Sequence, residues 1–137
     1  MRDPQKLQVA LRASGLAVAT YRFTAAFPVH ERYGLAAQMR RASVSIASNI
    51  AEGCGRAGER DFLRFLYIAR GSATELDIQL RLALELGFGS PQDGSTLADE
   101  IDHVQRMLNR LTSSVRSKVT SVAVPPPRGT NRLRRQP

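Results

Sequence analysis

Apolar residues recur at alternating steps of four and three along most of this chain. The longest unbroken series starts at Phe62 and continues through Leu66, Ala69, Ala73, Leu76, Leu80, Ala83 and Gly87. This spacing keeps one face of a helix against a partner helix. It therefore predicts a long helix over residues 59–86, ended by the glycines around residue 88.

Three other segments show helical spacing. The first starts at Asp3-Pro4, which is typical of a helix N-terminus, and ends at Phe27-Pro28. The second starts near residues 29–31 and runs to about residue 52, and the last starts at Ser90 or Ser95 and runs to about Lys118. The predicted apolar faces are Leu7, Ala10, Leu11, Ser14, Ala17, Val18, Tyr21, Thr24 and Ala25; Leu35, Met39, Ala42, Ile46, Ile50 and Gly53; and Leu97, Ile101, Val104, Leu108, Leu111 and Val115.

Four long amphipathic helices with short connections and no credible strand predict an all-α fold. The expected architecture is an antiparallel up-and-down four-helix bundle formed by residues 1–119. Residues 120–137 contain three consecutive prolines and four arginines without an apolar period. They are typical of a basic, extended or disordered tail.

The helix predicted over residues 59–86 carries a second apolar stripe, opposite its heptad face. Its members are Tyr67, Gly71, Ile78 and Leu82. A helix that is apolar on two faces is typically covered on two faces. We therefore expect a subunit interface here, the alternative being isolated apolar residues on an ordinary surface. On the second helix, Gln38, Ser45, Asn49 and Glu52 form a polar row, which is either a buried hydrogen-bond network or a solvated face.

The charge balance favours anionic partners. The chain has 20 Lys and Arg against 12 Asp and Glu, a net charge of +8. Half of this excess lies in residues 1–119, with 16 basic and 12 acidic residues, and half in the four arginines of residues 120–137. Nucleic acid is the first candidate for such a surface, and a solvated surface with a solubilising tail is the alternative. The candidate phosphate-binding residues are Arg40, Arg41, Arg56, Arg60 and Arg64, and the alternative role for them is ion pairing, as between Glu52 and Arg56.

Other classes of site find little support. His30 and His103 lack ligand spacing, and Cys54 is the sole cysteine, so we expect no metal site, no cofactor and a reduced, cytoplasmic setting. The sequence contains no stretch of about 18 apolar residues, so we expect no membrane span. The glycines at 53, 55 and 58 match a dinucleotide fingerprint, but a helix, not a strand, is expected before them. Glu52 and Glu59 flank this turn and are a weak candidate for a pair of acid–base catalytic residues. We expect that the protein is not an enzyme.

A family resemblance adds to this interpretation. It rests on Glu31-Arg32-Tyr33-Gly34-Leu35, Gln38, Arg40-Arg41-Ala42, Ser45-Ile46, Asn49-Ile50-Ala51-Glu52-Gly53, Gly55-Arg56, Phe62, Phe65-Leu66, Ala69-Arg70-Gly71-Ser72 and Glu75-Leu76. This order resembles the four-helix-bundle proteins encoded in intervening sequences of bacterial 23S ribosomal RNA genes. They are related to the accessory variability protein of diversity-generating retroelements. The resemblance implies a cytoplasmic, non-enzymatic, ring-like homopentamer, and for the retroelement relatives it implies binding of nucleic acid and of a reverse transcriptase.

Together these observations predict a homo-oligomeric scaffold that binds RNA or DNA non-specifically through its arginines. Within this hypothesis, it serves as an accessory of a reverse transcriptase or of an RNA-processing complex. The alternative is a protein-interaction adaptor that does not bind nucleic acid.

Overall fold

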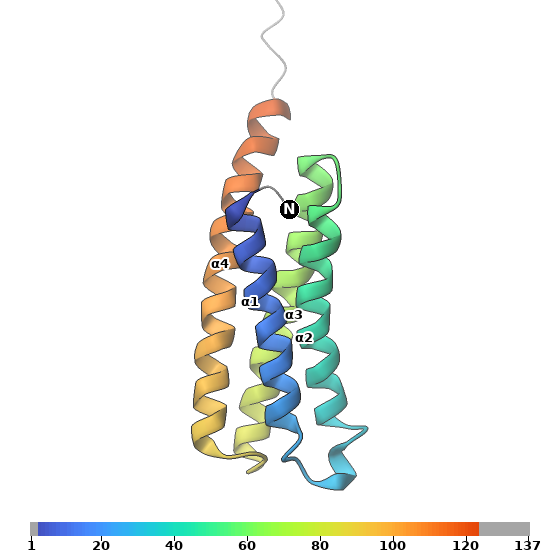
Figure 1. The fold of residues 1–137 in the computed structure, drawn as a ribbon, viewed down its shortest axis with the longest axis vertical. Coiled ribbons are helices and arrows are strands. Elements are labelled where there is room, and N and C mark those ends of the chain that lie inside the picture. Colours follow the sequence, from blue (N-terminus) through green and yellow to red (C-terminus); the bar gives the residue numbers. More distant parts are fainter. Residues whose placement is uncertain (1–2, 124–137) are drawn as a thin grey trace, which may run out of the picture.

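Four helices pack side by side in this protein (Figure 1). The computed structural model describes residues 3–123. Its elements are α1 (Pro4–Thr24), the short 3-10 helix η1 (Val29–Glu31), α2 (Leu35–Cys54), α3 (Glu59–Glu85) and α4 (Pro91–Ala123). Each helix contacts the next one along the chain, and α4 closes the bundle against α1, so α1 and α3 are diagonal to each other. The predicted all-α four-helix fold is confirmed.

The core is built from one apolar face of each helix. On α3 the predicted series is buried from Phe62 to Ala83, and Gly87 lies beyond the helix and is exposed. On α4 the whole predicted series from Leu97 to Val115 is buried. On α2 every predicted member is buried except Leu35, which is half-buried. The faces predicted for these three helices are therefore correct.

The face predicted for α1 is wrong. The side chains that α1 buries are Val9, Ala13, Leu16, Thr20, Phe23 and Thr24. Of the predicted members only Thr24 is among them, whereas Leu7, Leu11, Val18 and Tyr21 are 40, 64, 49 and 47% exposed. The two faces are hard to separate from sequence because the buried series also advances by alternating steps of four and three. The bundle buries one of these faces and leaves the other on its surface.

The helix ends follow the predicted capping chemistry at most positions. The Asp3 side chain accepts a hydrogen bond from the backbone N–H of Gln5 at 2.9 Å, and Pro4 opens α1. Ser90 does the same for Asp93 at 3.0 Å, so α4 begins at Pro91 and not near Ser95. Beyond α3, Gly87 has a φ of 76°, a conformation that favours glycine.

The start of α2 lies later than predicted. The sequence places it near residues 29–31, but those residues form η1, and α2 begins at Leu35. The Glu31 carboxylate accepts a hydrogen bond from the backbone N–H of Leu35 at 3.1 Å. Glu31 is therefore the residue that satisfies the free N–H groups at the start of α2, rather than the first residue of a longer helix.

The last helix extends past the predicted boundary at residue 119. It continues to Ala123, although Val115 is the last buried side chain up to residue 121 and Val119 is only half-buried. Figure 1 shows this end of α4 rising beyond the neighbouring helices. The tail predicted over residues 120–137 lies outside the described residues from 124 onward.

The polar row of α2 is divided between the interior and the solvent. The hydroxyls of Ser45 and Ser72 are 2.8 Å apart and link α2 to α3. The Asn49 amide donates to the Ser45 carbonyl at 2.8 Å and to its hydroxyl at 3.1 Å. Gln38 and Glu52 are exposed. The predicted network therefore exists at two of its four positions.

Candidate nucleic-acid and subunit interfaces

Arg40 holds two helices together. Its Nε donates to the hydroxyl of Thr24 at 2.9 Å, and one terminal nitrogen donates to the Tyr21 carbonyl at 3.4 Å. The guanidinium also lies 4.7 Å from the centre of the Tyr21 ring. A cation at the C-terminal end of a helix interacts favourably with the helix dipole and its last carbonyls. The half-buried Arg40 side chain therefore contacts the C-terminal end of α1, and the sequence did not indicate this structural role.

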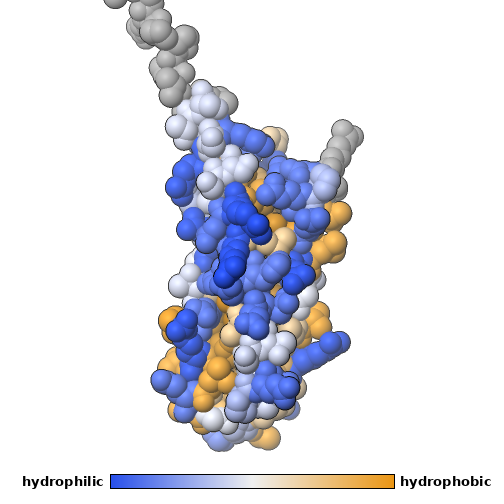
Figure 2. Space-filling view, turned by 90° about the vertical axis from the view of Figure 1, so that its left-hand side faces the viewer, coloured by the Kyte–Doolittle hydropathy of each residue, from blue (hydrophilic) through white to orange (hydrophobic). Residues whose placement is uncertain are grey.

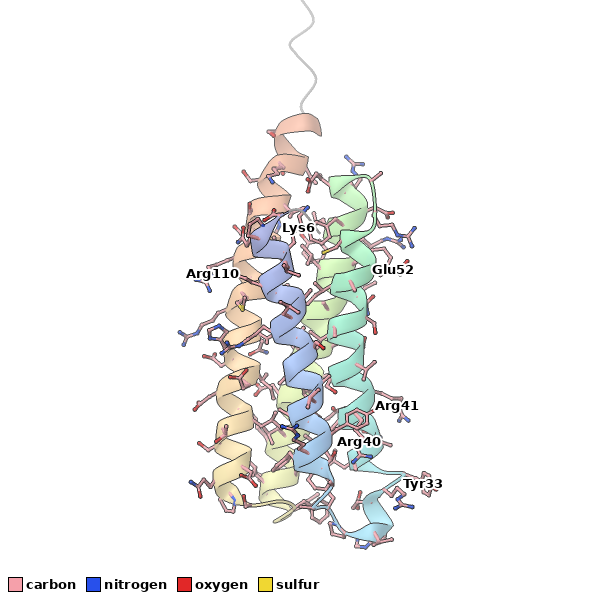
Figure 3. All side chains as sticks on the ribbon, viewed as in Figure 1. Lys6, Tyr33, Arg40, Arg41, Glu52 and Arg110 are labelled. Carbon is pink, nitrogen blue, oxygen red and sulfur yellow. The ribbon has the colours of Figure 1, made fainter. Side chains whose placement is uncertain are left out.

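Arg41 projects into solvent on the next position of α2. It is exposed, and no carboxylate of residues 3–123 forms an ion pair with it. Figure 3 shows Arg41 and Tyr33 pointing away from the bundle on the same side, at the end of the molecule where α2 begins. Tyr33 is 88% exposed. On this side, this end of the bundle therefore presents both an exposed guanidinium and an exposed aromatic ring.

Three further arginines lie at the opposite end of α2. Arg56 donates to Glu52 at 2.8 Å and lies 4.0 Å from Asp61, and Arg64 donates to Asp61 at 3.2 Å. The guanidinium carbons of Arg56 and Arg64 each lie 5.0 Å from the centre of the Phe65 ring. The predicted pair of Glu52 with Arg56 is confirmed.

Arg60 differs from these two arginines. It is exposed, and it makes no ion pair among the described residues. At this end of the bundle it is the one predicted site residue whose charge is not shared with a carboxylate in residues 3–123.

The structure separates the five predicted arginines into two groups. Arg41 and Glu52, both labelled in Figure 3, are eleven residues apart on α2, which corresponds to about 16 Å along the helix. Arg40 and Arg41 lie near one end, whereas Arg56, Arg60 and Arg64 lie near the other. A single compact patch of five arginines is therefore not formed, although a long polyanion could reach both groups.

The predicted interface residues of α3 all lie on its solvent side. Ile78 and Leu82 are 54 and 48% exposed, and a Cβ added at Gly71 would meet no atom within 4 Å. Tyr67 is 42% exposed, but its hydroxyl accepts a hydrogen bond from Arg116 Nε at 2.9 Å. Tyr67 therefore links α3 to α4, and Gly71, Ile78 and Leu82 form the open part of the stripe.

The glycines of the α2–α3 turn serve packing and chain reversal. Gly53 is still helical and buried, and a Cβ there would lie 2.8 Å from the Phe62 ring and 2.9 Å from Phe65 Cβ. Gly55 follows the end of α2, and Gly58 precedes the start of α3. The element directly before this turn is α2 rather than a strand, which agrees with the sequence-based argument against a dinucleotide site.

Within residues 3–123, no three His, Cys, Asp or Glu side chains gather as metal ligands would. Over the same range, no helix combines the length and the apolar character that crossing a membrane requires.

These features define an all-α helical bundle with exposed arginines and two uncovered apolar faces. The chain belongs to the family of 23S rRNA-intervening sequence proteins, whose family model matches residues 5–110. This confirms the family indicated by the residues of α2 and α3.

A solved structure has the same fold. It is a crystal structure of a protein with unknown function from the S23 ribosomal protein family of Bacteroides thetaiotaomicron. The match has a TM-score of 0.71 at 21% sequence identity and covers 80% of this chain and 98% of that one. At this identity the likeness concerns the fold alone. No significant similarity to a curated protein was found.

Proposed function

We propose that this protein is a non-enzymatic, homo-oligomeric scaffold in the cytoplasm that binds RNA or DNA through exposed arginines. The observation that carries this proposal is the exposure of Arg41 and Arg60 without a carboxylate partner among the described residues. Such groups neutralise phosphates without reading base sequence. Arg56 and Arg64 share their charge with acids and contribute less, and Arg40 acts within the fold.

Self-association would raise the affinity for nucleic acid of arginines that lie this far apart. A monomer offers few free arginines at each end of the bundle. In an oligomer each weak contact is repeated, and the effective concentration of the next contact raises the overall affinity. The exposed Ile78 and Leu82 on α3 favour such an assembly. The homopentamer and the reverse transcriptase or RNA-processing partner implied by the family resemblance stay predictions.

A protein-interaction adaptor is the second candidate. The ion pairs that Arg56 and Arg64 form with Glu52 and Asp61 favour it, because they give these arginines a role without nucleic acid. In this alternative, the apolar faces would bind protein and the net charge of the bundle would serve solubility.

Fluorescence anisotropy across a salt series separates the two functions. The probes are a structured RNA and a matched DNA duplex, and the proteins are the full chain and a version ending at Ala123, where α4 ends. We expect binding by both forms that weakens with salt, with a slope that reports the phosphates neutralised. Binding by the full chain alone would move the site to residues 124–137, and no binding by either form at low salt would leave the adaptor.

A matched pair of charge reversals locates the site. Arg41→Glu and Arg81→Glu change the net charge equally, but Arg81 already pairs with Asp77 at 3.4 Å. We expect Arg41→Glu to weaken binding at least several-fold more than Arg81→Glu does. Equal losses would indicate that overall charge, rather than Arg41, governs binding.

A further inference from the structure

The solvent side of α1 carries a regular apolar stripe. Its positions advance by four, three, four, three and four residues: Leu7, Leu11, Ser14, Val18, Tyr21 and Ala25. None is charged, and all six are exposed. A heptad series of this kind normally lies against another helix. Within the bundle the stripe is open except at Tyr21, whose ring contacts Arg40, because α1 buries its other face.

The solvent side of α3 repeats the same steps. Its positions are Arg64, Ile68, Gly71, Glu75, Ile78 and Leu82, and all six are exposed. Since α1 and α3 are diagonal, these two outer stripes face opposite sides of the molecule. Figure 2, which views the side occupied by α4, is mostly hydrophilic, with apolar residues mainly toward the margins and the lower end.

The two stripes lie at the same height along the bundle. Lys6 Nζ is 4.6 Å from the centre of the Phe62 ring, so position 6 of α1 is level with about position 62 of α3, a difference of 56. A path through α2 agrees with this value. Ser45 is level with Ser72, and Arg40 is level with Tyr21 and Thr24. Because α2 and α3 are antiparallel, position 40 is level with about position 77, which gives differences of 56 and 53.

Each member of the α3 stripe follows its α1 counterpart by 57 positions. Residues of α1 and α3 that lie at equal height differ in number by 53–56. The offset of 57 is therefore one to four residues larger, which corresponds to about 1.5–6 Å along the helix. Both helices run in the same direction, so the stripes of two copies placed side by side at equal height match layer by layer to within about 1.5–6 Å. Leu11 then faces Ile68, Tyr21 faces Ile78, and the small residues Ser14 and Gly71 meet at the centre.

The charges near the stripes favour the same pairing. α1 has Asp3 at its start and Arg22 near its end, whereas α3 has Arg60 and Arg64 near its start and Glu75 further along. Arg22 forms no ion pair within residues 3–123. In the parallel register described above, Asp3 lies opposite Arg60, and Arg22 lies about one helical turn from Glu75.

We propose that the outer stripe of α1 in one copy packs, parallel and in this register, against the outer stripe of α3 in the next copy. This inference rests on the proposed self-association and specifies its surfaces. Each subunit uses two different surfaces, so the contact is heterologous and generates a ring where the rotation between copies closes. Gly71 then serves a close approach between helices of two subunits.

Disulfide cross-linking tests this pairing. All variants carry Cys54→Ser, and their masses are first measured by light scattering. Val18→Cys and Glu75→Cys are made singly and together, because Val18 and Glu75 face each other in the proposed register. Leu82 lies seven residues beyond Glu75, about 10 Å along α3, so Val18→Cys with Leu82→Cys is the register control.

We expect the Val18→Cys/Glu75→Cys variant to form a ladder of covalent multimers on oxidation, while neither single variant and not the register control does so. Covalent dimers from a single variant would instead show that like surfaces meet, and equal cross-linking of the register control would overturn the register. An oligomer without cross-links would refute this pairing and leave self-association intact. A monomeric mass for the parent protein would refute both.

Discussion

Arg40 Nε on α2 donates a hydrogen bond to the Thr24 hydroxyl on α1 at 2.9 Å. That hydroxyl in turn donates to the Thr20 carbonyl at 2.8 Å. The guanidinium is therefore part of a chain of contacts that fixes the C-terminal turns of α1 against α2.

Replacing Arg40 should reduce stability more than replacing its neighbour. Arg40→Met keeps most of the aliphatic length but removes a charged donor from the buried Thr24 hydroxyl, and we expect a loss of about 1–2 kcal/mol in the free energy of unfolding. Arg41→Met should change it by less than about 0.5 kcal/mol, because Arg41 is exposed. Urea unfolding of both variants measures the difference, and equal losses would show that the contact with Thr24 contributes little.

A charge on the outer stripe of α3 should prevent assembly. Leu82→Arg leaves the core face untouched, because Leu82 is 48% exposed, but places a guanidinium in the proposed contact. We expect light scattering to report a lower mass than for the parent protein. Ser113→Arg adds the same charge to an exposed position of α4 and should keep the parent mass. If Leu82→Arg also retains that mass, α3 does not contribute the interface.

Two glycine substitutions should have opposite effects. An alanine Cβ at Gly53 would lie within 3 Å of both Phe62 and Phe65, so α2 and α3 would have to move apart. We expect Gly53→Ala to lower the free energy of unfolding by about 1–3 kcal/mol. A Cβ at Gly15 meets nothing within 4 Å, and Gly15→Ala should raise it by up to about 1 kcal/mol through helix propensity. Urea unfolding at one protein concentration compares the two, and a neutral Gly53→Ala would argue against close packing there.

The Cys54 thiol should make stability depend on alkaline pH. Burial raises the pKa of Cys54 above its ordinary value of 9.0, although the Lys6 ammonium acts in the opposite direction. The folded state therefore favours the neutral thiol. Its contribution is fully present below the pKa of the unfolded state and is lost as pH rises through the higher pKa of the folded state.

Denaturant unfolding between pH 7 and about pH 10 tests this dependence. The stability of the parent protein should fall relative to that of Cys54→Ser above about pH 9. The Cys54→Ser variant lacks the thiol but keeps the other titrating groups, so their effects cancel in the comparison. A constant difference between the two proteins across this range would show that burial does not perturb the thiol.

The sequence predicted the helices of this protein better than it predicted which side of each helix is buried. On α3 and α4 the apolar series stands out, so the core face was clear. On α1 both Leu16 and Val18 belong to series with the same steps, and one chain does not reveal which series faces its own bundle. The start of α2 failed for a local reason, since a glutamate before a helix is equally typical of its first turn and of a cap, and Glu31 is the cap.

The candidate site shows a similar division. Residue type and spacing identified the ion pair between Glu52 and Arg56, because an i,i+4 pair depends only on local geometry. The same reasoning grouped Arg40 with Arg41, although one contacts Thr24 sixteen residues away and the other faces solvent. Contacts between distant segments decide such roles, and a helical wheel does not contain them.

The extension of α4 past the other helices gives the bundle two unlike ends. Up to residue 121, Val115 is the last buried residue of α4, and the helix continues for eight residues beyond it to Ala123, about 12 Å. In the proposed ring, all subunits have the same orientation, so the end of α4 that extends past the other helices would lie at the same end of the ring in every subunit. Such an assembly is polar: its two openings differ in depth and lining, and a bound strand would meet a different surface on each side.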